Sequence, residues 1–268
     1  MKTSRKLTEA GLMLALSTIL SLLKLFELPY GGSITFASML PMVIFAYRHG
    51  VKWGLLAGLA NGVIQMLFGL NNLSYATSAA AVVAIICLDY LFAFTATAIG
   101  AAFRNVKSSG AGLAYGALCA CVIRYIFHVI SGCTVWAGLS IPTQDALLYS
   151  LSYNATYMIP ETIVTVVAGA LIGGSLDFRS ETLKPAKKGS SAAGNALGWA
   201  ASAAAIAAVT AIAVIVFPHL QNAESGEFDI TSLRAVDPVS VIVIAAVAAV
   251  VIAACLLIKN SKTKKCAA

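Results

Sequence analysis

The stretch that decides the fold class is Val239–Ile258, with the sequence VSVIVIAAVAAVVIAACLLI. It contains 20 residues and no charged side chain. A helix of roughly 20 apolar residues is long enough to cross the hydrocarbon core of a bilayer. In the whole chain 11% of the residues are charged, whereas a soluble domain contains about 25%. We therefore predict an all-α polytopic membrane protein.

Apolar runs and helix breakers in the rest of the chain predict seven more membrane spans. The second of the eight is short, and the first follows Lys2, Arg5 and Lys6 in the manner of a signal peptide. No convincing cleavage site follows that first run, so we expect it to be a retained helix. The eight expected spans cover residues 7–26, 34–47, 51–70, 76–103, 111–132, 146–176, 197–217 and 239–258.

Basic residues alternate with the expected spans and predict their orientation. If the N-terminus lies inside, the inner segments hold 15 of the 18 basic residues, and the outer segments hold Arg234 and several acidic residues. Cytoplasmic loops of membrane proteins carry the excess of Lys and Arg. We therefore expect both termini on the cytoplasmic side. The net charge of +7 is explained by this orientation and does not require nucleic acid as a partner.

The composition of the chain changes after about residue 180. The segment 184–191, KPAKKGSS, has the Pro, Gly, Ser and Lys content of a linker. The two spans after it consist almost entirely of Ala, Val and Ile. We therefore expect a six-helix unit at 1–180, a basic cytoplasmic linker at 181–196 and a two-helix extension of unknown role at 197–268.

Four ionisable residues fall deep inside the expected spans, away from their ends, namely Asp89, Arg124, His128 and Glu161. Such residues are costly in a bilayer and mark functional sites by default. Arg124 and His128 are four residues apart and share one helix face. Trp136, Tyr149, Tyr153 and Asn154 follow in the outer parts of the same two spans and their loop. The pattern predicts an outward-facing cavity, aromatic at its mouth and acidic at its floor, that suits a small cationic aromatic ligand.

Structural explanations for the same residues stay open. Asp89 can neutralise Arg124, and His128 can join two helices by a hydrogen bond. Glu161 follows Pro160, which frees a backbone carbonyl and kinks the helix. Tyr and Trp near a membrane boundary form aromatic belts. The spacing of His128, Asp89 and Glu161 does not support a zinc site.

Other motifs narrow the class of protein further. The sequence contains no nucleotide-binding loop, HExxH motif or nucleophile elbow, so we expect neither enzymatic activity nor a cofactor. Gly11 and Ala15 form a small-residue face on the first expected helix. Such faces let helices approach closely, either within the chain or against another membrane subunit.

Four motifs in order carry a resemblance to a known family. They are Tyr30–Thr35 (YGGSIT) with Met39–Met42 (MLPM), Leu88–Tyr90 (LDY), Arg124–Trp136 (RYIFHVISGCTVW) and Tyr149–Glu161 (YSLSYNATYMIPE). Over about residues 5–180 the chain resembles the thiamine-specific substrate-binding (S) components, of ThiT type, of energy-coupling factor (ECF) transporters. The resemblance implies a six-helix S-component core, to which the two C-terminal helices are additional.

The resemblance also implies a set of thiamine-binding residues. Asp89 falls where the family has an acidic residue facing the thiazolium. The other matched positions are Tyr90, His128, Trp136, Tyr149, Asn154 and Tyr75. This chain departs from the family in two places: Gly32 stands where some members have a Trp, which leaves Tyr30 to supply that wall, and Asp89 is one methylene shorter than the Glu of some members.

For the assembly, the resemblance implies a bacterial plasma membrane protein that takes up thiamine together with a transmembrane coupling (T) subunit and two ATPase subunits, which use the ATP. Gly11 and Ala15 would then contact the coupling subunit. Two alternatives stay open. One is an S component for another vitamin or a thiamine precursor, and the other is a stand-alone proton-coupled carrier with Asp89, Arg124 and Glu161 as its relay.

Overall fold

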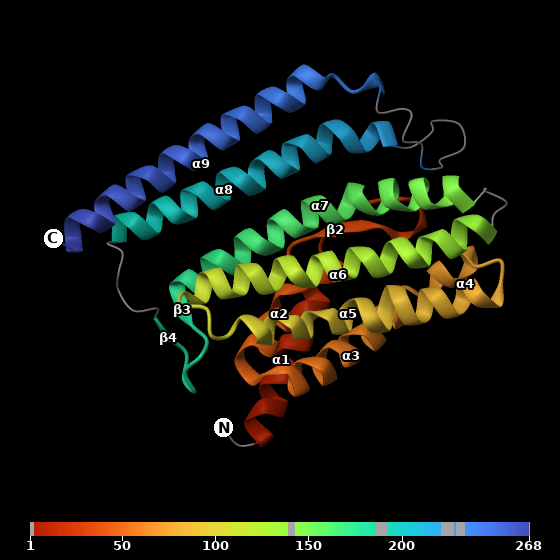
Figure 1. The fold of residues 1–268 in the computed structure, drawn as a ribbon, viewed down its shortest axis with the longest axis horizontal. Helices are drawn as coiled ribbons and strands as arrows, with labels where there is room; N and C mark the ends of the chain where they lie inside the picture. Colours follow the sequence, from red (N-terminus) through yellow and green to blue (C-terminus); the bar gives the residue numbers. More distant parts are fainter. Residues whose placement is uncertain (1–2, 139–142, 186–191, 221–227, 229–233, 268) are drawn as a thin grey trace.

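The computed structural model describes residues 3–138, 143–185, 192–220, 228 and 234–267, and its long helices lie side by side in a layered bundle (Figure 1). The prediction of an all-α membrane fold is confirmed. The α-helices are α1 (Thr3–Leu22), α2 (Leu40–His49), α3 (Val51–Phe68), α4 (Ala79–Ala84), α5 (Ala93–Thr95), α6 (Ser109–Gly138), α7 (Thr143–Ser175), α8 (Ala192–Val216) and α9 (Pro238–Ala267).

Among the described residues, six segments are long and apolar enough to cross a membrane. They are Val51–Phe68, Ala79–Phe103, Ser109–Val135, Asp145–Ser175, Ala196–Leu220 and Pro238–Lys259. Each corresponds to one of the eight expected spans. The other two expected spans are also helical but differ in kind: α1 carries Arg5, Lys6 and Glu9, and α2 has ten residues. Ten helical residues reach about 15 Å, so α2 is too short to cross alone, and nine of its residues are buried inside the protein.

The expected spans 7–26 and 34–47 are wrong at their facing ends, where the structure has a β-hairpin. Helix α1 ends at Leu22, and β1 (Lys24–Glu27) pairs antiparallel with β2 (Ser33–Thr35). Tyr30 and Gly31 have φ angles of 66° and 90°, which reverse the chain between the two strands. Ala37, with φ of 56°, also has a left-handed backbone conformation. A right-handed helix cannot pass through such a residue, and α2 begins after it, at Leu40. Hydropathy missed the hairpin because Leu25, Phe26 and Ile34 extend the apolar runs on its two sides.

The span 79–103 is one continuous segment that changes its helical type. It passes from α4 through the π-helical segment η3 (Ile85–Phe92) and α5 into the 3-10 segment η4 (Ala96–Phe103). A π-helical turn is wider than an α-helical turn and is frequent at functional sites. Asp89 and Tyr90 both lie in η3.

Glycines at every fourth position of α3 let this helix lie directly against the backbone of the 79–103 segment. A Cβ atom at Gly58 would lie 2.9 Å from the Phe94 carbonyl oxygen, and one at Gly62 would lie 2.8 Å from the Tyr90 carbonyl oxygen. Both distances are too short for a side chain, so the close approach requires glycine. The sequence reading missed this small-residue face and singled out Gly11, where an added Cβ would meet nothing within 4 Å.

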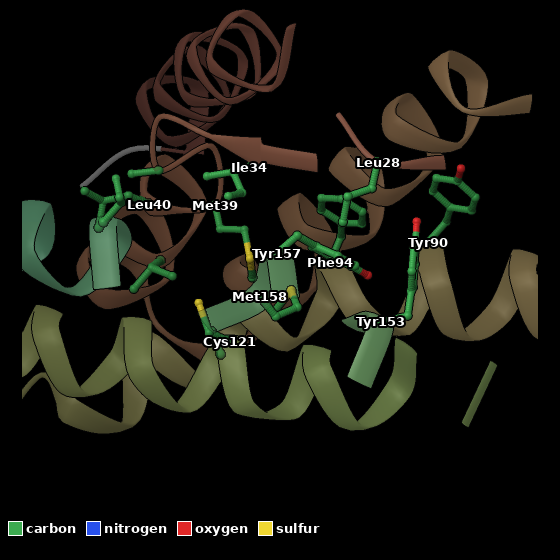
Figure 2. Packing of buried hydrophobic residues seen from close by; sticks show 14 of the residues in the cluster. Leu28, Ile34, Met39, Leu40, Tyr90, Phe94, Cys121, Tyr153, Tyr157 and Met158 are labelled. Carbon is green, nitrogen blue, oxygen red and sulfur yellow. The ribbon is translucent and has the colours of Figure 1, made fainter. Parts of the chain in front are cut away.

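The hydrophobic core lies between β2, α2, the 79–103 segment, α6 and α7. Figure 2 shows Tyr157 and Met158 of α7 beside Phe94, with Ile34 and Met39 above them. Ile34 of β2 is a member of this core. The hairpin therefore packs against the helices and is part of the folded unit.

Helices α8 and α9 form a layer beside α7, in which α8 separates α9 from the rest of the bundle (Figure 1). Asp237 caps the start of α9 by accepting hydrogen bonds from the Ser240 hydroxyl at 2.5 Å and from the N–H groups of Ser240 and Val239, each at 3.0 Å. These bonds lower the pKa of the Asp237 carboxyl, the hydroxyl bond most of all. The chain therefore enters α9 through a defined N-cap.

We expect Gly62→Ala to destabilise the fold, because the new Cβ atom must push the Tyr90 carbonyl away. Overpacking of this kind costs about 1–3 kcal/mol of unfolding free energy. Thermal unfolding of the detergent-solubilised protein measures the loss. The matched control is Gly11→Ala, whose Cβ atom meets open space, and equal midpoints for the two variants would contradict the packing argument.

Candidate functional site

A cavity of about 360 Å³ opens at the end of the bundle that carries the β1–β2 hairpin. The hairpin, the ends of α1 and α3, η3, α6 and α7 all contribute to its walls. The described residues that line it include Lys24, Glu27, Tyr30, Gly32, Thr35, Gln65, Asn72, Tyr75, Asp89, Tyr90, Phe94, Arg124, His128, Tyr153, Asn154, Tyr157, Met158 and Glu161.

Five of the seven expected ligand-binding residues line this cavity: Tyr75, Asp89, Tyr90, His128 and Asn154. The structure thus brings together residues from four separate stretches of the sequence, in η2 (Leu70–Tyr75), η3, α6 and α7. The remaining two are Tyr149, which contacts a different neighbour, and Trp136, whose side chain lies outside the described residues.

Asp89 lies at one end of a row of hydrogen-bonded side chains. Its Oδ1 lies 2.6 Å from Nδ1 of His128, and its Oδ2 accepts a 2.7 Å bond from the Ser131 hydroxyl. Nε of Arg124 donates to Nε2 of His128 at 2.9 Å. Because Nε2 is the acceptor, the imidazole proton lies on Nδ1 and is donated to Asp89. This row orients one carboxylate toward the cavity.

Arg124 is linked to Asp89 through His128. Its guanidinium carbon lies 4.5 Å from the centre of the Phe94 ring, a cation–π contact that supports the charge inside the membrane. The sequence left open whether His128 binds ligand or joins helices. In the structure its side chain bridges α6 and η3 and also lines the cavity.

Asn154 and Tyr90 both have hydrogen-bond partners within the chain. Nδ2 of Asn154 donates to the Ser150 carbonyl at 2.8 Å, and its Oδ1 accepts a 2.5 Å bond from the Tyr157 hydroxyl. The Tyr90 hydroxyl donates to the Gly69 carbonyl at 3.0 Å and accepts from Nδ2 of Asn72 at 2.9 Å. These bonds fix the two residues in the cavity wall and join η3 to the end of α3.

Glu161 anchors the hairpin to α7. Its side chain is 2% exposed and accepts two bonds from Thr35, one from the backbone N–H at 2.6 Å and one from the hydroxyl at 2.7 Å. The Tyr153 hydroxyl adds a second anchor, because it donates to the Pro29 carbonyl and accepts from the Gly32 N–H at 2.8 Å. The sequence reading identified Glu161 but not Thr35, since no spacing signal connects residues so far apart in the chain.

A series of tyrosine rings forms the aromatic wall. Tyr30 packs edge-on against Tyr75 at 5.1 Å between ring centres and against Tyr153 at 6.3 Å, and Tyr153 packs against Tyr157 at 5.7 Å. A Cβ atom at Gly32 would lie 2.7 Å from the Tyr153 hydroxyl. A larger side chain at position 32 would therefore displace this wall, and Tyr30 contributes the ring on the hairpin side.

Tyr149 faces a different neighbour. Its hydroxyl donates to the carbonyl of Phe228 at 2.7 Å, and the two rings lie 5.3 Å apart. It is absent from the described lining of the cavity. Trp136 belongs to the last turn of α6, but its side chain lies outside the described residues. Roles for both residues in ligand binding remain predictions.

Comparison with known proteins identifies the family. A family model described as Thiamine transporter protein (Thia_YuaJ) matches residues 7–176. The chain belongs to the thiamine transporter family. Its resemblance to ThiT-type S components is thereby confirmed. The matched segment ends with α7, so that α8 and α9 lie beyond it.

Two proteins of Bacillus subtilis are similar in sequence to this family member. The thiamine transporter ThiT is 32% identical over 179 residues, which cover 62% of this chain and 89% of that protein. The uncharacterized protein YybS is 28% identical over 154 residues, which cover 58% of this chain and 45% of that protein.

A solved structure of ThiT from Listeria monocytogenes matches the fold with a TM-score of 0.50 and 23% identity. The match covers 63% of this chain and 92% of the Listeria chain. At this level of identity the likeness concerns the fold alone. It supports the prediction of an S-component core with additional C-terminal helices.

We expect Glu161→Ala to lower the free energy of unfolding by about 3 kcal/mol, since the buried Thr35 N–H and hydroxyl both lose a charged acceptor. Thr35→Val removes one of the two bonds and should cost less. The double variant should be less destabilised than the two single losses combined, because both act on one contact. Unfolding free energies of the wild type, the two single variants and the double variant form a double-mutant cycle that measures this coupling. Asp145→Ala, an exposed carboxylate of α7, is the control, and additive losses would contradict the coupling.

Proposed function

We propose that this protein is the substrate-binding component that captures thiamine from the extracellular side for ATP-driven uptake with an ECF coupling subunit and two ATPase subunits. The observation that carries the proposal is the cavity that Asp89 lines together with the tyrosine wall. Membership of the thiamine transporter family and the name of the Bacillus relative support thiamine as the ligand.

The size and chemistry of the cavity suit thiamine. Small-molecule sites have volumes of roughly 300–1,000 Å³, and this cavity has about 360 Å³. Thiamine joins an aminopyrimidine to a positively charged thiazolium ring. Tyrosine rings bind flat aromatic groups and attract cations.

The formal charge of the cavity favours a cation. The described lining contains three carboxylates, Glu27, Asp89 and Glu161, and two basic side chains, Lys24 and Arg124. Lys24 pairs with Glu27 at 2.5 Å, and Glu161 is occupied by Thr35. Asp89 bonds His128 and Ser131, and the family resemblance matches its position to the acidic residue that faces the thiazolium. We therefore assign Asp89 to that ring, with Tyr90 beside it.

The other assignments follow the family. His128, Asn154 and Tyr149 are assigned as ligand contacts and Tyr75 as a further tyrosine contact, while Trp136 is assigned as the stacking residue. Asn154 already bonds Tyr157 and Ser150, so a ligand that uses its carboxamide must replace one of these partners. We therefore expect a smaller effect from Asn154 than from Asp89.

The orientation follows from the charges at the end of the bundle opposite the cavity. The side chain of Arg5 donates to the Glu181 carbonyl there, and Arg48 donates to the carbonyls of Phe178, Ser180 and Glu181 at 2.6–3.1 Å. Helix α9 ends at the same end of the bundle as α1 begins (Figure 1). The positive-inside rule then assigns both termini to the cytoplasm and the cavity to the outside.

The coupling subunit is expected to dock on α1. Gly11 has open space around its Cα atom, and Leu12 beside it is 65% exposed. Gly11 and Ala15 would let a partner helix approach closely. The chain itself contains no nucleotide-binding loop, so the proposal assigns ATP hydrolysis to the partner subunits.

We expect Asp89→Asn to weaken thiamine binding by roughly 10- to 100-fold, because a charged contact to the thiazolium is lost. Titration of the purified protein by tryptophan fluorescence or calorimetry measures this change. A thiamine analogue with an uncharged ring in place of the thiazolium should bind the wild type poorly and lose little on the substitution. The control Asp145→Asn should bind thiamine normally. Equal affinities of wild type and Asp89→Asn would refute the assignment.

Reconstitution in vesicles distinguishes the proposed transporter from a proton-coupled carrier. We expect no concentrative thiamine uptake by this chain alone under a pH gradient, and ATP-dependent uptake once the coupling and ATPase subunits are added. Uptake by the chain alone that stops when the pH gradient is collapsed would favour the relay of Asp89, Arg124 and Glu161. A competition panel of vitamins and thiamine precursors in the binding assay tests the choice of ligand.

A further inference from the structure

We propose that the outer end of the C-terminal extension is part of the binding site in this chain. Phe217 and Phe228 act as positioning residues that hold the β1–β2 hairpin and Tyr153 against the cavity and so slow release of the ligand. This inference rests on the proposed function and extends it to a segment beyond the family-matched residues 7–176.

The first contact lies on the hairpin. Phe217 begins the 3-10 segment η5 (Phe217–Leu220), which directly follows α8. The centre of its ring lies 5.0 Å from that of Phe26 in β1. Lys24 and Glu27, at the two ends of the same strand, line the cavity. Leu220 is fully buried in the same cluster as Ile34 of β2. The end of α8 therefore packs on the segment that covers the cavity.

The second contact lies on the tyrosine wall. Phe228 is 3% exposed, and its ring meets Tyr153 edge-on at 5.1 Å and Tyr149 at 5.3 Å. Its carbonyl accepts the hydrogen bond from the Tyr149 hydroxyl. Tyr153 lines the cavity and holds the hairpin turn through Pro29 and Gly32. Phe228 thus packs against the residue that connects α7 to the turn.

The two contacts differ from ordinary core packing because the core fold exists without them. The Listeria ThiT chain is covered to 92% by the match to 63% of this chain, which leaves little room in it for a counterpart of α8 and α9. The outer halves of α7 and α8 are also separated by an apolar groove of about 540 Å³, at the edge of which Phe217 lies. The extension therefore contacts the hairpin and Tyr153 through its own outer end, at Phe217 and Phe228.

The effect on binding follows from the position of the hairpin. The hairpin and the tyrosine wall form one side of the cavity that we assign to the ligand, so their movement widens the route by which the ligand leaves. An aromatic pair slows such a movement by about two- to tenfold. The bound state carries all of these contacts, so their loss should act on dissociation more than on association.

Full-length variants test the proposal. We expect the thiamine dissociation rate, measured by chase with unlabelled thiamine, to rise about tenfold in Phe228→Ala, which loses two ring pairs, and about threefold in Phe217→Ala, which loses one. Phe228→Tyr keeps the ring and should retain the wild-type rate. Val214→Ala, a 55% exposed residue one turn before Phe217 on α8, is the matched control and should also retain it.

A second measurement does not need the ligand. Hydrogen exchange in residues 24–35 should be faster in Phe217→Ala and Phe228→Ala than in the wild type and Val214→Ala, with exchange in α6 unchanged. If the wild type binds thiamine and the two alanine variants release it at the wild-type rate, the proposal is overturned. If the wild type does not bind thiamine, the proposed function fails. In that case faster exchange confined to 24–35 supports the positioning role, and unchanged exchange overturns it.

Discussion

A carboxylate between membrane helices is costly unless it has partners, and the chain supplies partners for Asp89. His128 and Ser131 of α6 bond its two oxygens, and Arg124 completes the row. This row joins η3 to α6 and fixes the separation of the two walls of the cavity. The backbone contact of η3 with the glycines of α3 fixes its other side. The same contacts of η3 with α6 and α3 therefore determine both the position of the Asp89 carboxylate and the shape of the cavity.

The hairpin over the cavity is held in a comparable way. Glu161 and Tyr153 of α7 bond its backbone at Thr35, Gly32 and Pro29. Both helices that supply the polar groups, α6 and α7, pack against each other along their length (Figure 1). A displacement of one helix is thus transmitted to the floor and the cover of the cavity together, which suits a site that must enclose its ligand.

Much of the fold could be predicted from the sequence because a bilayer permits few structures. Apolar runs such as 51–70 and 146–176 have one stable outcome, and the ionisable residues inside them identified one wall of the site. The hairpin could not be predicted in this way, because Phe26 and Ile34 have the hydropathy of a span and its reversal depends on the φ angles of Tyr30 and Gly31. The contact of Tyr149 with Phe228 could not be predicted either, because the family motif contains no information about Phe228. The partnership of Glu161 with Thr35 joins residues 126 positions apart, which only the tertiary fold brings together.

The π-helical segment η3 limits how this gene can change. A π-helical turn closes its hydrogen bond one residue later than an α-helical turn, so η3 accommodates extra chain within a continuous helix. Successive residues in an α-helix are rotated by about 100°. Loss of a single codon between Ile85 and Asp89 would let the segment relax to the α form, but it would rotate Asp89 and the residues after it relative to α4. A change in the length of this segment would therefore misplace Asp89 even if every side chain were kept.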